Sequence, residues 1–337
     1  MIVARTIETE KTVLVTEPEP TLEPGRAIVR VHDVALCGTD LHIWDRSYPA
    51  DLPVVQGHEC SGVIEAIDPV NPDGLRPGDK VTVNPSITCG QCHACRHGRF
   101  NTCVRMRVIG CYEDGGMAEL ISVATDKLCP VPANLSLEVA ALGEPMSIAM
   151  QAVNRGRPEA GETALVLGCG PIGVLATLYL TELGVDVVAA DIDPNRAASA
   201  TLLGAVQTMV VPTDGPFTGP DEEVSLVIEA TGVPSSMVNA IHLVSHAGRI
   251  VQVGISQRDI PVPIKELTFK ELDILGSRNS LALIPQGLEL LARHEKAARS
   301  LITHRFGIAD VNDAYELMRA RTEYVGKIVV QLPAATL

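Results

Sequence analysis

A glycine-rich turn between a predicted strand and a predicted helix most constrains the fold of this 337-residue chain. The apolar run Thr163–Leu167 precedes Gly168-Cys-Gly170-Pro-Ile-Gly173, and a helix is expected to follow as far as about Leu183. Val185–Asp191 then predicts a second strand, and another helix begins at Pro194. Strands that alternate with helices in this way imply a parallel sheet with right-handed crossovers.

The same alternation continues toward the end of the chain. Further strands are expected at Val224–Glu229, Arg249–Val253 and Asp273–Leu275, then helices at Pro285–His294 and Asp310–Arg319, and a final strand at Lys327–Leu332. The segment Pro212–Glu223 is rich in Pro, Gly and acidic residues. We therefore expect a loop or one short turn there in place of a crossover helix.

The first half of the chain has a different character. Its short β-branched segments are separated by Gly and Pro and predict strands at Ala27–Val34, Cys60–Ile67 and Lys80–Pro85. This pattern favours a β-rich domain closed into a barrel-like core. A helical stretch at Leu137–Asn154 is interpreted as the connection to a second domain, and the length of the chain suits two domains.

Composition excludes several classes of function. The formal charge of −14 argues against a nucleic-acid groove, which needs a surplus of Lys and Arg. The chain begins without a basic and apolar leader, and its apolar runs are too short to cross a bilayer, so a soluble cytoplasmic protein is expected.

Four of the nine cysteines lie in one short loop, as Cys89-Gly-Gln-Cys92-His-Ala-Cys95 followed by Cys103. Four thiolates at these spacings suit one tetrahedral zinc ion with a closed coordination shell, which supports structure and does no chemistry. An iron–sulfur cluster also uses four cysteines, but no partner spacing supports one here. The other cysteines are scattered, so a reducing compartment explains the set better than disulfides do.

A second group of metal-binding residue types is spread over three motifs. These are Cys37-Gly-Thr39-Asp, Gly57-His58-Glu59 and Gly143-Glu144-Pro. Taken singly, each residue can be explained without a function, for example as a small buried thiol or as a solvated charge. Together, one Cys, one His and one or two carboxylates suit a zinc ion that keeps one position open for water or substrate.

These motifs, the four-cysteine loop and the segment Leu301-Ile-Thr-His-Arg-Phe resemble the zinc-containing medium-chain dehydrogenases over essentially the whole chain. Within that superfamily the chain is most similar to the sorbitol, polyol and threonine dehydrogenase branch. The resemblance implies a GroES-like barrel catalytic domain formed by residues 1–147 and 278–337. It also implies a doubly wound Rossmann nucleotide-binding domain at residues 148–277, and dimers or tetramers paired through that domain.

The resemblance also implies roles for individual residues. Cys37, His58 and Glu59 match the catalytic zinc ligands, and Glu144 matches a carboxylate that binds the metal-bound water or enters the metal shell itself. Thr39 and His42 match a relay that carries the hydroxyl proton outward, which fits a zinc-bound alcohol of lowered pKa. Arg278 aligns with an arginine near the substrate and Glu144. Trp44 and Tyr48 are expected to form apolar walls of the substrate pocket.

The glycine turn is interpreted as the site of a dinucleotide. Its glycines permit a tight turn and a close approach of the pyrophosphate to the helix N-terminus. Asp191 ends the next strand, roughly 20 residues on, where a carboxylate binds the ribose diol and repels a 2′-phosphate, so NAD is favoured over NADP. Asp193 is the better candidate for the helix N-cap. The expected cofactor-binding residues are Gly168, Gly170, Pro171, Ile172, Gly173, Asp191, Arg196, Thr231, Val253, Gly254, Ile255 and Ser277.

Arg196 and Cys169 are also expected to lie at the cofactor. Arg196 is expected to pack near the adenine or to pair with Asp191. Cys169 lies inside the turn, so its alkylation would block the cofactor.

The predicted function is oxidation of a secondary hydroxyl of a polyol, sugar alcohol or sugar acid by NAD, with two zinc ions per subunit. An oxygen ligand such as Glu59 or Glu144 leaves a polar site, which suits a hydroxyl-rich substrate. A threonine, amino-alcohol or vicinal-diol dehydrogenase is the near alternative, although threonine dehydrogenases tend to carry Asp at the position of Glu144. A regulator that binds NAD without catalysis is the alternative from another class.

Overall fold

The computed structural model describes residues 1–71, 73–212, 217–320 and 322–333. The chain divides into two compact units, Met1–Glu144 with Ile284–Leu337 and Pro145–Leu283. The sequence-based boundaries were placed after residues 147 and 277, a few residues from this division. The division falls in the first turn of helix α4 (Gly143–Gly156).

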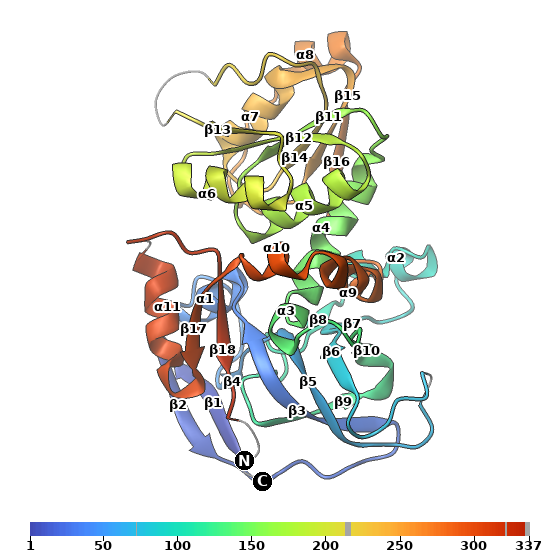
Figure 1. Ribbon diagram of the computed structural model, residues 1–337, viewed down its shortest axis with the longest axis vertical. Helices are drawn as coiled ribbons and strands as arrows, with labels where there is room; N and C mark the ends of the chain where they lie inside the picture. The colour runs from blue at the N-terminus through green and yellow to red at the C-terminus, as the bar shows by residue number, and fades with distance from the viewer. Residues whose placement is uncertain (72, 213–216, 321, 334–337) are drawn as a thin grey trace. The chain divides into compact units, whose positions relative to one another are not determined.

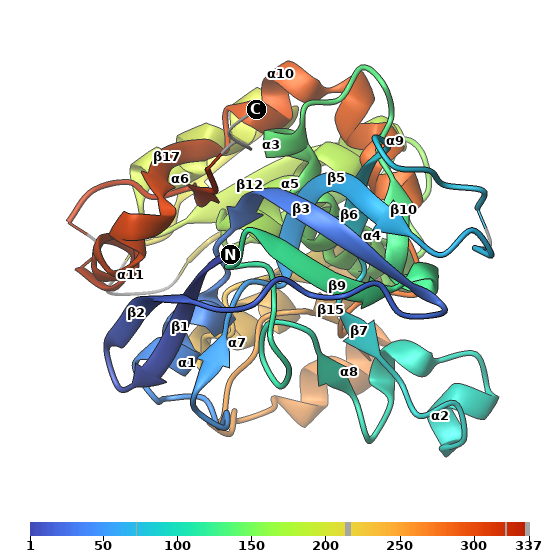
Figure 2. The ribbon, with the colours of Figure 1, turned by 90° about the horizontal axis from the view of Figure 1, so that it is seen from below.

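The first unit is built on β-sheets (Figures 1 and 2). Within the described residues its main sheet has the order β10-β6-β5-β3-β18-β17, with β9 also pairing with β3. These strands are β3 (Arg26–Ala35), β5 (Glu59–Ile67), β6 (Lys80–Val83), β9 (Leu120–Ala124), β10 (Leu128–Pro130), β17 (Ile302–Gly307) and β18 (Lys327–Gln331). A smaller sheet has the order β2-β1-β4, from β1 (Ile2–Glu8), β2 (Lys11–Thr16) and β4 (Val54–Val55).

Strand β3 organises this unit because it pairs with β5, β9 and β18. Its side chains are buried along nearly the whole strand, as expected for a strand covered on both faces. The register with β5 shifts at two places, which bends the pair. Gly62 lies at this bend, where a Cβ atom would stand 2.2 Å from the carbonyl oxygen of Arg30, so a larger residue cannot replace it without moving the strands.

The first unit also contains several short helices. They are α1 (Gly38–Trp44), α2 (His93–Arg96), α3 (Leu137–Ala140), α9 (Ile284–Arg293), α10 (Glu295–Arg299) and α11 (Val311–Ala320). A two-stranded ribbon, β7 (Ser86–Ile87) with β8 (Arg107–Val108), flanks the four-cysteine loop. Trp44 and Tyr315 stack with ring centroids 5.4 Å apart inside the apolar core of this unit.

The second unit holds a parallel sheet of order β13-β12-β11-β14-β15-β16 among the described residues. Its strands are β11 (Thr163–Leu167), β12 (Asp186–Asp191), β13 (Gln207–Val210), β14 (Val224–Glu229), β15 (Val244–Gln252) and β16 (Asp273–Gly276). Helices α5 (Pro171–Glu182), α6 (Pro194–Ser199), α7 (Pro234–Leu243) and α8 (Ile264–Lys270) pack along these strands (Figure 1). The order reverses between β11 and β14, as in a doubly wound Rossmann fold.

Most predicted elements are present, with two kinds of difference. The helix expected at Leu137–Asn154 is two helices, α3 and α4, because Pro145 has no N–H for the carbonyl of Ala141 and the helix must begin again. Several elements were not predicted, among them strands β9, β10, β13 and β17 and helices α1, α7 and α8. In the segment Pro212–Glu223, Pro212 and residues 217–223 contain neither helix nor strand, which agrees with the expected loop, and residues 213–216 lie outside the described part.

No helix among the described residues combines the length and the apolar character needed to span a membrane.

Candidate active site and metal centres

The pairing of β3 with β5 brings three predicted zinc ligands together. Ala35 lies opposite Glu59 in this pair, so Cys37, two residues beyond β3, comes next to the start of β5. One ligand atom each from Cys37, His58 and Glu59 lies within 4.8 Å of the others. His58 and Glu59 are buried, and Cys37 is half-buried. A sulfur, a nitrogen and an oxygen at these separations fit a zinc ion with a further position open.

Asp40 supports this group and was not assigned a role from the sequence. It is fully buried, and its Oδ2 accepts a hydrogen bond from the backbone N–H of Cys37 at 2.9 Å, which caps helix α1. Its Oδ1 lies 3.5 Å from Nδ1 of His58. Burial disfavours the charged form of His58, but the Asp40 carboxylate and the Cys111 thiol together outweigh it and hold the pKa of His58 well above its usual value. A carboxylate at Nδ1 leaves Nε2 to bind a metal.

Lys327 is the second residue that sequence reasoning missed. Its Nζ donates to both carboxylate oxygens of Glu59, at 2.6 and 2.5 Å, and to the carbonyl of Leu36 at 2.8 Å. Burial opposes its charge, yet Glu59 raises the pKa of Lys327 above its usual value. The signal in the sequence was a lysine opening an otherwise apolar strand, since a buried lysine requires a partner.

Glu144 lies in the first turn of α4 and is not part of the group formed by Cys37, His58 and Glu59. Burial raises the pKa of Glu144 to about 7, and although His58 opposes this shift, the nearby charge of Glu59 adds to it. A carboxyl group of this kind can hold or release a proton near neutral pH.

Helix α1 carries the predicted proton relay. The Sγ of Cys37 lies 3.8 Å from Oγ1 of Thr39, and His42 follows one helical turn later. His42 is exposed, and its Nδ1 lies 2.8 Å from the hydroxyl of Ser47. Thr39 therefore lies beside the metal-binding group, and His42 at the solvent end of the helix.

The prediction that Trp44 lines the substrate pocket is wrong. Trp44 is 1% exposed, stacks on Tyr315 and donates from Nε1 to Asn312 at 3.2 Å. It follows Ile43 on the buried side of α1, where an amphipathic helix places its large apolar residues. Tyr48 is half-buried and its hydroxyl lies 2.6 Å from that of Tyr112.

The four cysteines of the loop form one group, with their Sγ atoms within 4.8 Å of one another. Cys103 accepts hydrogen bonds from the backbone N–H of Cys89 at 3.3 Å and of Arg105 at 3.4 Å. Backbone N–H groups lower the pKa of Cys89 to about 6 and also lower the pKa of Cys92, whereas desolvation raises that of Cys95 to about 12. The loop thus stabilises thiolates at positions that fit a closed tetrahedral site. His93 stacks on His97 and is exposed.

The glycine turn has the geometry of a dinucleotide site. Gly168 has φ of 96°, and a Cβ atom on Gly173 would stand 1.8 Å from the carbonyl oxygen of Gly168. Gly170 is the N-cap of α5, and Pro171 opens that helix. The backbone N–H groups at this end of the helix therefore remain available for a phosphate.

Asp191 ends β12 beside this turn. Its Oδ2 accepts from the N–H of Cys169 at 2.7 Å, and its Oδ1 accepts from the N–H of Asp193 at 3.0 Å. Asp193 is the N-cap of α6, as predicted, and its carboxylate accepts from Asn195. Of the two expectations for Arg196, pairing with Asp191 is not what the structure shows, because its Nε lies 3.9 Å from Asp193.

The remaining predicted cofactor residues lie at the carboxyl ends of strands. Thr231 follows β14, and Ser277 and Arg278 follow β16. Val253, Gly254 and Ile255 follow β15. A Cβ atom on Gly254 would stand 2.1 Å from the backbone nitrogen of Gly232, so these two turns pack backbone against backbone. The proximity of Arg278 to Glu144 stays a prediction.

The expectation that alkylation of Cys169 blocks the cofactor conflicts with the burial of this residue. Cys169 is 2% exposed, and burial together with the charge of Asp191 raises the pKa of its thiol to about 12. We expect iodoacetamide at pH 8 to modify Cys169 at least about a hundredfold more slowly in the native protein than in urea. Peptide mass spectrometry over time measures both rates, and equal rates would contradict this expectation.

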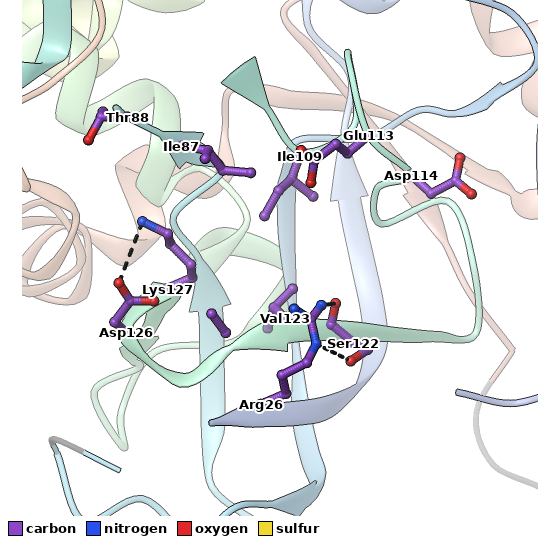
Figure 3. A pocket seen from close by; sticks show the side chains of 11 residues that line it. Arg26, Ile87, Thr88, Ile109, Glu113, Asp114, Ser122, Val123, Asp126 and Lys127 are labelled. Atoms are coloured by element: carbon purple, nitrogen blue, oxygen red, sulfur yellow. Dashed lines mark hydrogen bonds and ion pairs between the residues drawn. The ribbon is translucent and has the colours of Figure 1, made fainter. Parts of the chain in front are cut away.

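A separate cavity of about 610 Å³ lies elsewhere in the first unit (Figure 3). It contains none of the predicted site residues. Its charged lining residues are already partnered, Arg26 with Ser122, Lys127 with Asp126, Glu113 with Arg107 and Asp114 with Arg5. The charged groups that line this cavity are therefore already engaged in hydrogen bonds or ion pairs within the protein.

Comparison with known proteins agrees with both halves of the chain. Residues 23–133 match the alcohol dehydrogenase GroES-like domain family, and residues 171–293 match the zinc-binding dehydrogenase family. An uncharacterised zinc-type alcohol dehydrogenase-like protein of Haemophilus influenzae is 35% identical over 88% of this chain and 89% of its own length. Sorbitol dehydrogenase of Bacillus subtilis is 30% identical over 89% of this chain and 88% of its own length.

A solved structure shows the same fold. The short chain alcohol dehydrogenase rspB of Escherichia coli CFT073, crystallised with NADH, superposes with a TM-score of 0.90 at 29% identity and covers 98% of this chain and 99% of its own. The predicted two-domain fold is thereby confirmed. The chain belongs to the zinc-containing medium-chain alcohol dehydrogenase superfamily and is an NAD(P)-dependent zinc alcohol or polyol dehydrogenase.

Proposed function

We propose that this enzyme oxidises a secondary hydroxyl of a polyol, sugar alcohol or sugar acid to the ketone, with hydride transfer to NAD. The observation that carries the proposal is the group formed by Cys37, His58 and Glu59, in which the third ligand is an oxygen. The similarity to sorbitol dehydrogenase supports the same substrate class. A metal site that has an oxygen ligand and keeps one coordination position free suits a substrate with several hydroxyls.

Zinc bound by Cys37, His58 and Glu59 would lower the pKa of a substrate hydroxyl toward neutral pH. The residues of the chain then supply positioning and proton transfer. Asp40 holds the ring of His58, and Lys327 holds the carboxylate of Glu59. Thr39, beside the metal group, accepts a hydrogen bond from the substrate hydroxyl and passes its own hydroxyl proton on as it takes up that of the substrate.

The rest of the site completes this scheme. His42 delivers the proton from Thr39 to solvent, where its ring is exposed. Glu144 is a second carboxyl group that can exchange a proton. The four-cysteine loop holds a second, structural zinc ion.

NAD is preferred to NADP in this proposal because of Asp191. Its carboxylate lies beside the glycine turn and accepts two backbone N–H groups. Each oxygen retains lone pairs for the ribose diol, and its negative charge opposes a 2′-phosphate. The thiolate-rich metal loop supports the reducing cytoplasm as the compartment.

The proposed function is tested by following NADH absorbance with a panel of polyols, aldonates, diols and threonine at alkaline pH. Parallel reactions contain NADP, or a chelator followed by added zinc. We expect turnover of at least one polyol or aldonate with NAD, loss with chelator and recovery with zinc. Turnover of threonine alone would show that the substrate is an amino alcohol and not a polyol. NADH binding without turnover of any alcohol would favour a regulator.

We further propose a homo-oligomer in which a second copy pairs with the nucleotide-binding unit. Strand β16 is an edge of its sheet and pairs only with β15 among the described strands. Ile274 on this strand is an exposed apolar residue, and Ile264 and Phe269 on α8, the helix that precedes β16 in the chain, are exposed as well. An open edge with apolar neighbours favours strand pairing with an identical edge about a two-fold axis.

Light scattering after size-exclusion chromatography tests this arrangement. Ile274→Lys is expected to shift the protein toward the monomer, because it places a charge at the paired edge. Val70→Lys is the matched control, since Val70 is an exposed apolar residue of the other unit. A monomeric wild-type protein, or equal dissociation in both variants, would contradict the proposal.

A further inference from the structure

Glu229 is a buried carboxylate that the scheme above does not use. It is the last residue of β14, and none of its surface is exposed. Its Oε1 accepts from the N–H of Thr231 at 3.0 Å and from the hydroxyl of the same residue. Its Oε2 accepts from the N–H of Gly232 at 3.0 Å and from Nε2 of Gln252 at 2.6 Å.

In all four of these hydrogen bonds the Glu229 carboxylate is the acceptor. The Thr231 hydroxyl oxygen accepts from the N–H of Val233 at 2.9 Å, which directs its hydrogen toward Glu229. The Gln252 amide nitrogen also donates to the carbonyl of Gly254 at 2.7 Å, so both of its hydrogens are used. Because a carboxyl group surrounded only by donors has no acceptor for a proton of its own, the geometry selects the ionised form.

The negative charge of Glu229 has no cationic partner in the part of the chain that the structure describes. None of the ion pairs among the described residues includes Glu229, in contrast to the buried Glu59, which Lys327 neutralises. Hydrogen bonds compensate for its lost hydration, but they leave a full negative charge inside the second unit.

Its position relates this charge to one half of the dinucleotide. Strand order reverses between β11 and β14, and a dinucleotide binds across the carboxyl ends of the strands at such a point. The half of the sheet that ends in Asp191 receives the adenosine. The half that begins with β14 therefore receives the nicotinamide, and Glu229 ends that strand. The turns it holds, at Thr231-Gly232 and Gly254, are the ones expected to line this half.

We propose that the buried charge of Glu229 shifts the binding preference of the site toward the oxidised cofactor, whose nicotinamide ring is positive, and away from the reduced cofactor, whose ring is neutral. The inference rests on the proposed dinucleotide site. The phosphates and the adenosine are identical in both forms, so their contributions cancel in the ratio of the two dissociation constants. The ratio of the dissociation constant of NADH to that of NAD therefore isolates the effect of charge near the ring.

Glu229→Gln tests this role in the zinc-loaded enzyme, with Glu223→Gln as the matched control. Glu223 is exposed and precedes the same strand at its other end, so the two variants change the net charge equally. NADH binding is measured by its fluorescence and NAD binding by competition. In Glu229→Gln the ratio is expected to fall by about fivefold to tenfold, and in Glu223→Gln it is expected to stay within about twofold of wild type.

A second variant neutralises the charge and keeps the carboxylate. Gln252→Lys places an ammonium where the amide now donates to Glu229 and Gly254, and an ammonium can donate to both. It should lower the ratio in the same direction, and it decides the question if Glu229→Gln does not fold. An unchanged ratio in the folded variants, with both forms weakened equally, would show a structural role only and overturn the proposal. Wild-type protein that binds neither form would instead refute the dinucleotide site.

Discussion

Replacing Lys327 with methionine is expected to lower the free energy of unfolding by about 3 to 5 kcal/mol when the catalytic zinc is absent. The side chains of Lys327 and Glu59 are 3% and 1% exposed, so the substitution leaves an unpaired carboxylate in the core. In the zinc-loaded enzyme the loss should be smaller, because the metal also compensates the charge of Glu59. Urea unfolding of zinc-loaded and zinc-depleted protein measures both values.

The double variant Glu59→Gln/Lys327→Met is the control for this prediction. It removes both charges, and most of the lost stability of the zinc-depleted protein should return, since two uncharged groups carry little desolvation cost. Equal losses in the single and double variants would show that Lys327 acts through packing and through its bond to the Leu36 carbonyl rather than through Glu59.

Cys37→Ala and Cys92→Ala each remove one of two zinc ions, but we expect the first to lower turnover and the second to lower stability. Cys37→Ala should reduce turnover at least about a thousandfold while cofactor binding and stability remain close to wild type. Cys92→Ala should lower the free energy of unfolding by about 3 kcal/mol or more, because a closed metal site contributes directly to folding. Turnover by the Cys92→Ala enzyme that stays folded should remain measurable.

Metal analysis, NADH fluorescence and thermal unfolding separate the two sites. Both variants should contain about one zinc per chain. The assignment of roles would be wrong if Cys37→Ala kept its activity, or if Cys92→Ala abolished activity in protein that retains wild-type stability.

Residues that act through neighbours in sequence could be predicted, because their spacing is visible. The four-cysteine loop, the glycine turn and the Asp193 cap are local patterns. The grouping of Cys37 with His58 and Glu59 depends on strand pairing; their residue types suggested it, and the family resemblance supported it. The enzyme class followed from the same resemblance.

Residues that act through long-range register could not be predicted from their local sequence. Lys327 meets Glu59 because β18 and β5 pair with the same strand, β3, and no local pattern reports that pairing. Asp40 was visible in its motif, but its contact with His58 depends on the same register. Trp44 was misplaced because an aromatic residue on a short helix has the same local sequence whether it faces a pocket or a core.

The division of the first unit into two separate stretches of sequence sets the order in which the enzyme can mature. Cys37, His58 and Glu59 are synthesised early, but Lys327 follows the entire second unit along the chain. At roughly 5 to 20 residues per second, the ribosome takes about 10 s or longer to make the residues between Glu144 and Lys327. During that interval Glu59 has no lysine partner, and the nascent enzyme must either load its metal before the site is closed or wait for the last strand of its barrel.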